Sequence, residues 1–143
     1  MILCGVSGSG KSTYAARAAK GGWEICSADH FFMKEGGKYD FNPSKLGEAH
    51  SSCFRRFIDL MSQYSYIIVD NTSTTALEVA PYYLAAKAFQ FDVQISHIKA
   101  SPAEAAARNI HSVPLHVVLA QDERIKDMLA NLPPYWDIEV REE

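Results

Sequence analysis

Short, almost wholly apolar runs recur along the chain and alternate with longer stretches whose apolar residues lie at helical spacing. Continuous apolar runs between glycine-rich or polar turns are typical of buried parallel strands, and these runs are shorter than ordinary helices. The pattern predicts strands over Met1 to Cys4, Trp23 to Ser27, Tyr66 to Asp70, Phe91 to His97 and Trp136 to Val140.

Alanine-rich or amphipathic segments predict a helix after each of the first strands. The predicted helices are Lys11 to Lys20, Ser44 to Tyr64, Leu77 to Phe89, a segment from Pro102 that carries Arg108, and Pro114 to Ala130. The third helix requires Pro81 to lie in its first turn, because an interior proline removes a backbone hydrogen bond. Ser101 followed by Glu104 has the pattern of a capping box. Strands that alternate with helices predict an α/β fold, a three-layer αβα domain with a mainly parallel sheet.

Length and composition narrow the class of protein. The chain has 143 residues, 48% hydrophobic and 22% charged, as in an ordinary globular protein, so we expect one domain over residues 1–143. A formal net charge of -3 excludes a global basic field, so any contact with nucleic acid depends on a local patch. The three cysteines form no CxxC pair, which predicts a reducing compartment and no disulfide-linked partner. Without a signal peptide or a membrane-spanning run, we expect a cytoplasmic, intracellular protein with no membrane partner.

Residues 5–12, with the sequence GVSGSGKS, match the phosphate-binding pattern GxxxxGK[ST] between a predicted strand and a predicted helix. In this pattern backbone N–H groups bind phosphate, Lys11 reaches the β and γ phosphates, and the Ser12 hydroxyl ligates Mg²⁺. The residues expected to bind ATP, or another nucleoside triphosphate, are Ser7, Gly8, Ser9, Gly10, Lys11, Ser12 and Thr13. The alternative is a tight turn that exposes a lysine.

Two aspartates follow predicted strands at the edge of the sheet where parallel α/β proteins bind their ligands. Asp70 ends the run YIIVD, the form of a Walker B carboxylate that holds Mg²⁺ together with Ser12. Asp29 ends the segment CSAD, where it is placed to take a proton from an attacking hydroxyl. The alternative for each aspartate is a helix cap or a turn residue.

A kinase also needs positive charge near the transferred phosphoryl group. Arg108 is the best candidate, because it lies late in its predicted helix and just before residues 109–113, a candidate lid. The alternative is a solvated helix arginine. A second positive cluster is either a binding site for acceptor phosphates or a solvated face. It contains Lys34, Lys38, Lys45, Arg55 and Arg56.

The histidines and two aromatic residues near the C-terminus give weaker evidence about function. The five histidines lack zinc-binding spacing, so metal ligation by histidine is not indicated. His50 lies on the apolar side of its predicted helix, where we expect a buried histidine first and a substrate contact second. Tyr135 and Trp136 are candidates to stack on a base, and core packing is the simpler interpretation.

With the segments GVSGSGKST, SADHFF, GKYDFNPSKLGEAH, IIVDNT and ARNIHSV, the chain resembles the polynucleotide kinase-like P-loop kinases from Met1 to about Ile125. It is similar to the 5′-kinase domain of phage polynucleotide kinase, and more closely to small animal P-loop proteins that bind a NEDD-type ubiquitin ligase. The resemblance implies a P-loop kinase fold with strand order 2-3-1-4-5. It also implies transfer of the ATP γ-phosphate to a 5′-hydroxyl end of DNA or RNA.

The resemblance assigns roles by motif. It implies that Asp29 is the general base, Asp70 the Walker B carboxylate and Arg108 the lid arginine. It further implies acceptor-site roles for His50, Arg56, Asn71 and Thr72. Two arginines of the phage-type enzymes are absent: Ala28 precedes the base, and Ile110 to Ser112 stand where a second lid arginine would follow.

The sequence therefore predicts a Mg²⁺-ATP-dependent phosphotransferase with Lys11, Asp29 and Arg108 as catalytic residues, acting on a nucleic-acid 5′ end. One alternative is a P-loop kinase of a small hydroxylated acceptor, such as a nucleoside, a modified base or a nucleotide sugar. Another is a nucleotide-binding module with little catalysis that works through protein partners. The presence of an acceptor-side base argues against that module.

Overall fold

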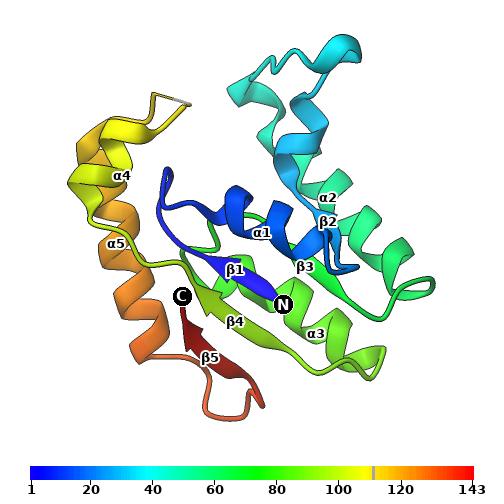
Figure 1. The fold of residues 1–143 in the computed structure, drawn as a ribbon. Helices are drawn as coiled ribbons and strands as arrows, with labels where there is room; N and C mark the ends of the chain where they lie inside the picture. Colours follow the sequence, from blue (N-terminus) through cyan, green and yellow to red (C-terminus); the bar gives the residue numbers. More distant parts are fainter. Residues whose placement is uncertain (111) are drawn as a thin grey trace.

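A parallel sheet lies at the centre of the fold (Figure 1). The computed structural model describes residues 1–110 and 112–143, and in them five strands pair in the order β2-β3-β1-β4-β5. Every pairing is parallel. The strands are β1 (Ile2–Cys4), β2 (Glu24–Cys26), β3 (Ile67–Val69), β4 (Gln94–His97) and β5 (Glu139–Glu142). The predicted α/β class, mainly parallel sheet and 2-3-1-4-5 order are confirmed.

Helices cover both faces of this sheet. They are α1 (Lys11–Ala19), α2 (Leu46–Met61), α3 (Ala76–Ala88), α4 (Pro102–Arg108) and α5 (Leu115–Ala130), with short 3₁₀ helices η1 (Ala28–Phe32), η2 (Glu35–Gly37) and η3 (Pro43–Lys45). Because side chains alternate along a strand, Ile2 and Cys4 pack into the core formed with α2, α3 and α5, whereas Leu3 packs with Ala15 of α1. This arrangement confirms the three layers. Of the helices in the described residues, none combines the length and the apolar character needed to span a membrane.

Helix α3 differs from its prediction in two ways. Pro81 lies inside the helix and beyond its first turn, so the prediction of a first-turn proline is wrong. The carbonyl that loses its helical partner belongs to Leu77, a residue that is 86% exposed, so water can reach it. The capping box occurs here, between Thr75 and Glu78, whereas the Ser101 side chain makes no cap hydrogen bond at α4.

Strand β5 begins later than predicted, at Glu139, and all four of its residues are exposed at the edge of the sheet. Trp136 lies before the strand and stacks on Tyr83 with a ring-centroid distance of 4.5 Å, which agrees with a packing role. Tyr135 is 79% exposed, so core packing is the wrong interpretation for it. The apolar character of this segment predicted a strand, but it did not show which residues pair with β4.

The three cysteines lie in the core of the fold. Cys4, Cys26 and Cys53 are buried free thiols. The Sγ atoms of Cys26 and Cys53 lie 3.3 Å apart, and Cys26 also donates a hydrogen bond to the backbone oxygen of Cys53 at 2.8 Å. These contacts join the end of β2 to α2.

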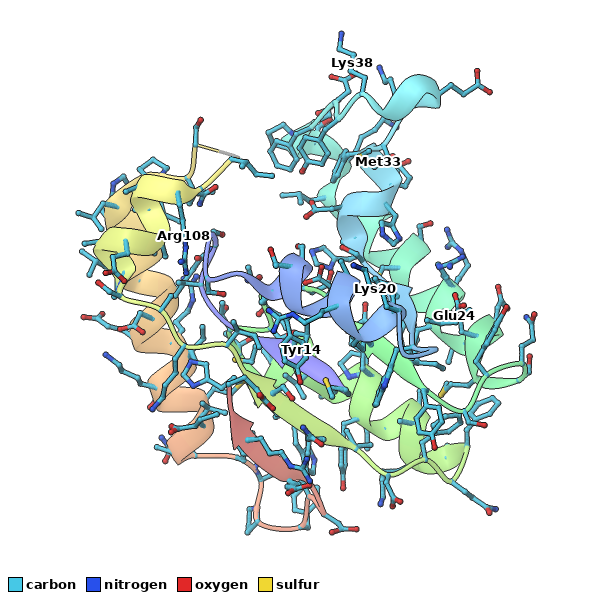
Figure 2. All side chains as sticks on the ribbon, viewed as in Figure 1. Tyr14, Lys20, Glu24, Met33, Lys38 and Arg108 are labelled. Carbon is cyan, nitrogen blue, oxygen red and sulfur yellow. The ribbon has the colours of Figure 1, made fainter. Side chains whose placement is uncertain are left out.

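A segment that we call the arm, residues 33–41, projects from the body beyond η1, and its Met33 and Lys38 are labelled in Figure 2. An antiparallel bridge between Met33 and Tyr39 closes its base. The Tyr39 ring packs edge-on against Phe32 of η1 at a centroid distance of 6.1 Å. The arm is thus anchored to the short helix that follows β2.

Candidate active site

The loop between β1 and α1 has the geometry of a phosphate-binding loop. Gly10 caps the N-terminus of α1 with φ 105° and offers no side chain to the first turn. The N–H groups at the start of an α-helix have no partner within the helix, and with the helix dipole they favour an anion. Ser12 and Thr13 are exposed in this first turn. The predicted loop therefore leaves its helix N-terminus open to phosphate.

Lys11 is held at the centre of this loop. Its side chain is buried, and Nζ donates to the backbone oxygens of Gly5 at 2.8 Å and Val6 at 2.9 Å. Burial lowers the pKa of Lys11 to about 8, against the opposing charges of nearby groups that include Asp70 and Asp29. At neutral pH the side chain therefore remains mostly an ammonium, the form that binds phosphate.

Asp70 and Ser12 form the candidate Mg²⁺ site. Asp70 follows β3, is 9% exposed and accepts a hydrogen bond from the Ser12 side chain. Burial raises the pKa of Asp70, and the Ser12 hydrogen bond and the charge of Lys11 oppose this rise. A hydroxyl and a carboxylate oxygen suit Mg²⁺, which commonly takes one or two protein oxygens and completes its shell with phosphate and water. Within residues 1–110 and 112–143 no group of three or more His, Cys, Asp or Glu is arranged to hold a metal ion, and this mode of binding needs none.

We expect Asp70→Asn to raise the Mg²⁺ concentration needed for half-maximal ATP turnover by about 10-fold and to lower kcat, because an amide oxygen carries no charge for the metal. A Mg²⁺ titration at saturating ATP measures both quantities. Asp92→Asn, at an exposed position outside the site, is the matched control. An unchanged titration would show that Asp70 is only a turn residue.

Arg108 reaches the phosphate loop from α4 (Figure 2). Its Nε donates to the backbone oxygen of Gly8 at 2.6 Å and its Nη2 to that of Ser9 at 3.0 Å. Helix α4 itself packs on the loop: a Cβ added at Gly8 would lie 2.1 Å from the backbone oxygen of Ala105. Arg108 therefore lies beside the phosphate loop, and its role as the lid arginine stays a prediction. Of its candidate lid, residues 109–113, His111 lies outside the described residues.

Gly8 and Gly10 form a matched pair for testing this packing. Both have positive φ, 82° and 105°, so alanine at either position costs roughly 1–2 kcal/mol in backbone strain. A Cβ at Gly10 meets nothing within 4 Å, whereas one at Gly8 collides with Ala105. We expect Gly8→Ala to lower the free energy of unfolding in urea clearly more than Gly10→Ala. Equal losses would mean that α4 is not firmly packed on the loop.

Asp29 lies at the start of η1 and is exposed. Its backbone N–H donates to the Oγ of Ser27 at 3.2 Å, and its charge interacts with both Lys11 and Asp70. The Tyr39 hydroxyl donates to its Oδ1 at 2.9 Å. A carboxylate, a lysine and a second carboxylate thus lie near one another at the carboxyl edge of the sheet, and their catalytic roles stay predictions.

Asn71 and Thr72 form hydrogen bonds that hold the backbone around the site. Asn71 accepts the backbone N–H of Ala28 through Oδ1 at 3.0 Å, and its Nδ2 donates to the Tyr82 hydroxyl at 3.3 Å. The backbone oxygen of Thr72 accepts the N–H of Gly5 at 3.1 Å. These contacts fix the start of η1 and the start of the phosphate loop.

The predicted acceptor residues on α2 lie apart from this group. His50 is exposed, so the expectation of a buried histidine is wrong, because the apolar face of α2 turns Ala49 inward instead. Arg56 bonds to the backbone oxygen of Ile25 at 3.4 Å and lies 3.8 Å from Glu24, on the outer side of β2. Their roles toward an acceptor stay predictions.

Ion pairs reduce the net positive charge of the predicted cluster. Lys34 pairs with Asp40 within the arm, and Lys45 pairs with Glu48 at 3.0 Å. Arg55 and Arg56 line a surface pocket that also contains acidic side chains. Acidic neighbours therefore partly neutralise the charge of this cluster. The sequence prediction did not take these neighbours into account.

Two contacts of the site were missed by sequence reasoning. Gln121 of α5 accepts the Ser7 backbone N–H at 2.8 Å and donates to the Ser7 Oγ at 3.1 Å. Tyr39 contacts Asp29. No motif marks Gln121, which is 114 residues from its partner. Tyr39 belongs to the segment GKYDFNP, one of those that carried the family resemblance, and this was the available signal.

A central parallel sheet of this order, with a phosphate-binding loop after the middle strand and helices on both faces, defines a P-loop domain with the kinase-like fold. The chain belongs to the AAA domain family, whose model matches residues 1–134. It is 33% identical to human (Homo sapiens) NEDD4-binding protein 2 over 121 residues. The match covers 79% of this chain and 7% of that protein, so the chain spans only a small part of the relative's length.

Solved structures agree on the fold. A chain in the structure of the Pnkp1/Rnl/Hen1 RNA repair complex is similar with a TM-score of 0.76 and 17% identity, over 92% of this chain and 45% of that chain. A gluconokinase from Sinorhizobium meliloti 1021 is similar with a TM-score of 0.61 and 16% identity, over 99% of this chain and 80% of that one. Shikimate kinase from Acinetobacter baumannii is similar with a TM-score of 0.53 and 20% identity, over 99% of this chain and 81% of that chain. The resemblance to polynucleotide kinase-like P-loop proteins is confirmed.

Proposed function

We propose that this chain is a Mg²⁺-ATP-dependent phosphotransferase that moves the ATP γ-phosphate to a 5′-hydroxyl end of DNA or RNA. The observation that carries the proposal is the exposed carboxylate of Asp29 just after β2, at the same edge of the sheet as Asp70, whose backbone N–H donates to the Cys26 oxygen at the end of β2 at 2.8 Å. A module that only binds nucleotide needs no base on the acceptor side of the loop. We assign residues 1–143 to one kinase domain that uses ATP, or another nucleoside triphosphate, and Mg²⁺.

Each residue of the site has a separate task. The Lys11 ammonium and the first-turn N–H groups of α1 bind the phosphates. Asp70 and Ser12 hold Mg²⁺, which when bound neutralises negative charge on the phosphate oxygens. Asp29 accepts the proton of the acceptor hydroxyl as its oxygen attacks the γ-phosphorus. Arg108 stabilises the negative charge of the transferred phosphoryl group.

A nucleic-acid acceptor is supported by similarity and by side chains around Asp29. One similar structure is an RNA repair complex, and the segments around Asp29 and Asn71 match the polynucleotide kinase pattern. Phe31 and Phe41, which follow Asp29 in η1 and in the arm, are 38% and 48% exposed. Exposed aromatic rings offer faces on which a nucleobase stacks.

A small hydroxylated acceptor is the second candidate. It is favoured by the pairing of Lys34 with Asp40 and of Lys45 with Glu48, which leaves less positive charge for a nucleic-acid backbone. The fold similarity to a gluconokinase and a shikimate kinase is compatible with such an acceptor.

We further propose a cytoplasmic location without a membrane partner or a disulfide-linked partner. Three free, buried thiols suit a reducing compartment. The net charge of -3 gives no attraction to an anionic membrane surface.

The test is transfer of labelled γ-phosphate from ATP to a panel of acceptors: 5′-hydroxyl DNA, 5′-hydroxyl RNA, nucleosides and sugars. The proposal expects label on an oligonucleotide 5′ end and none with the Lys11→Ala protein, the matched negative control. Label only on a nucleoside or sugar would establish the second candidate. ATP binding without transfer to any acceptor would favour a nucleotide-binding module.

A further inference from the structure

Tyr39 contacts the proposed general base from a different segment of the chain. Its hydroxyl donates a hydrogen bond to Asp29 Oδ1 at 2.9 Å. A tyrosine hydroxyl carries a single proton to donate, and an ionised carboxylate only accepts hydrogen bonds. With Oδ1 engaged in this way, Oδ2 is the oxygen left to receive a proton.

The backbone and the side chain of Asp29 are held from opposite sides. On the sheet side, Ser27 accepts the Asp29 N–H at 3.2 Å and Asn71 accepts the Ala28 N–H at 3.0 Å. These bonds fix the backbone of η1 and leave the carboxylate to rotate about its side-chain bonds. The contact with Tyr39 comes from the arm and fixes that rotation.

The arm in turn holds Tyr39. The antiparallel bridge to Met33 fixes its backbone, and the Asp40 N–H donates to the Phe32 oxygen at 2.9 Å. The Tyr39 ring is half-buried against Phe32. Burial raises the pKa of Tyr39, and the hydrogen bond and charge of Asp29 raise it further, so the hydroxyl keeps its proton and remains a donor across the neutral range.

We propose that Tyr39 is a positioning residue for phosphotransfer: it orients the Asp29 carboxylate so that Oδ2 faces the acceptor, and it links the base to the arm. The proposal rests on the phosphotransferase function above. In that reaction the acceptor O–H bond breaks and its proton goes to Asp29 Oδ2. The acceptor oxygen forms a bond to the γ-phosphorus, and the bond to the β-γ bridging oxygen breaks, leaving its electron pair on ADP. Tyr39 exchanges no proton in this step.

Kinetics of Tyr39→Phe test the proposal, since this change removes the hydroxyl and keeps the ring packed in the arm. We expect kcat for transfer to fall about 10-fold, the size of a lost charge-assisted hydrogen bond, with the KM for ATP unchanged. The change should have almost no further effect in an Asp29→Asn background, because Tyr39 acts through Asp29. Tyr64→Phe, an exposed tyrosine after α2, is the matched control. Unchanged kcat, or an equal loss in the Asp29→Asn background, would overturn the proposal.

A second measurement needs no activity. In protein labelled with ¹³C at tyrosine Cζ, Tyr39→Phe identifies the Tyr39 signal. Asp29→Asn should shift that signal, because the hydroxyl loses its anionic acceptor, while Asp59→Asn on α2 should leave it in place. If Asp29→Asn does not move it, the contact does not exist in solution and the inference fails. If the signal moves but the wild type transfers phosphate to no acceptor, the contact is real and the phosphotransferase function has failed.

Discussion

Replacing Arg108 with alanine is expected to lower kcat by roughly 10³-fold while changing the affinity for ATP only slightly. The reason is that charge on the transferred phosphoryl group is greatest in the transition state, so a cation placed there stabilises that state more than the bound substrate. Arg108 is in the right region, because it already donates to the backbone oxygens of Gly8 and Ser9. Steady-state kinetics and calorimetric ATP titration on the same variant separate the two effects.

Arg17→Ala is the control for Arg108, since it removes an exposed arginine in the last turn of α1. Arg108→Lys should recover only part of the lost rate, because an ammonium lacks the paired N–H groups of a guanidinium. If Arg108→Ala retained more than about a third of wild-type kcat, another cation would have to stabilise the transferred phosphoryl group. Arg124 would be the first to be tested.

Asp29→Asn is expected to reduce phosphate transfer by about 10²- to 10⁴-fold with ATP binding preserved. The change keeps the size of the side chain and leaves the phosphate loop and the Asp70 site intact. It removes the group that aligns and deprotonates the acceptor hydroxyl. Background ATP hydrolysis should fall less, because water needs less alignment than a bulky acceptor. Rates of transfer and of hydrolysis from the same labelled ATP give the comparison.

The internal control for Asp29→Asn is ATP binding by the variant itself. Asn retains an oxygen that can accept from Tyr39, so the arm should stay in place. Transfer at the wild-type rate would remove Asp29 from the mechanism. Loss of ATP binding together with transfer would mean that Asp29 supports the nucleotide loop instead.

Local motifs explain what the sequence could predict. The phosphate loop is contiguous, and apolar strands that end in an acid place Asp29 and Asp70 at the same edge of a parallel sheet. The strand order itself came from family resemblance, because pairing between distant segments leaves no local pattern. The separation between Ser7 and Gln121 shows the same limit.

Helix caps and the burial of single helix residues could not be predicted, because similar sequence patterns occur at more than one position. Thr75 with Glu78 and Ser101 with Glu104 have the same capping pattern, yet only the first pair forms the box. His50 occupies a helical position next to buried Ala49, and the burial of one neighbour does not fix that of the other. The spacing of polar and apolar residues sets the face of a helix only to within about one residue.

The contact between Gly8 and α4 has an evolutionary consequence. The atom that a Cβ at position 8 would meet is a main-chain oxygen, that of Ala105, which every amino acid carries. Smaller side chains at position 105 therefore cannot compensate for a larger residue at position 8. Relatives that keep α4 docked on the phosphate loop should retain glycine there. A relative with any other residue at this position should hold its counterpart of α4, and the arginine that it carries, displaced from the loop.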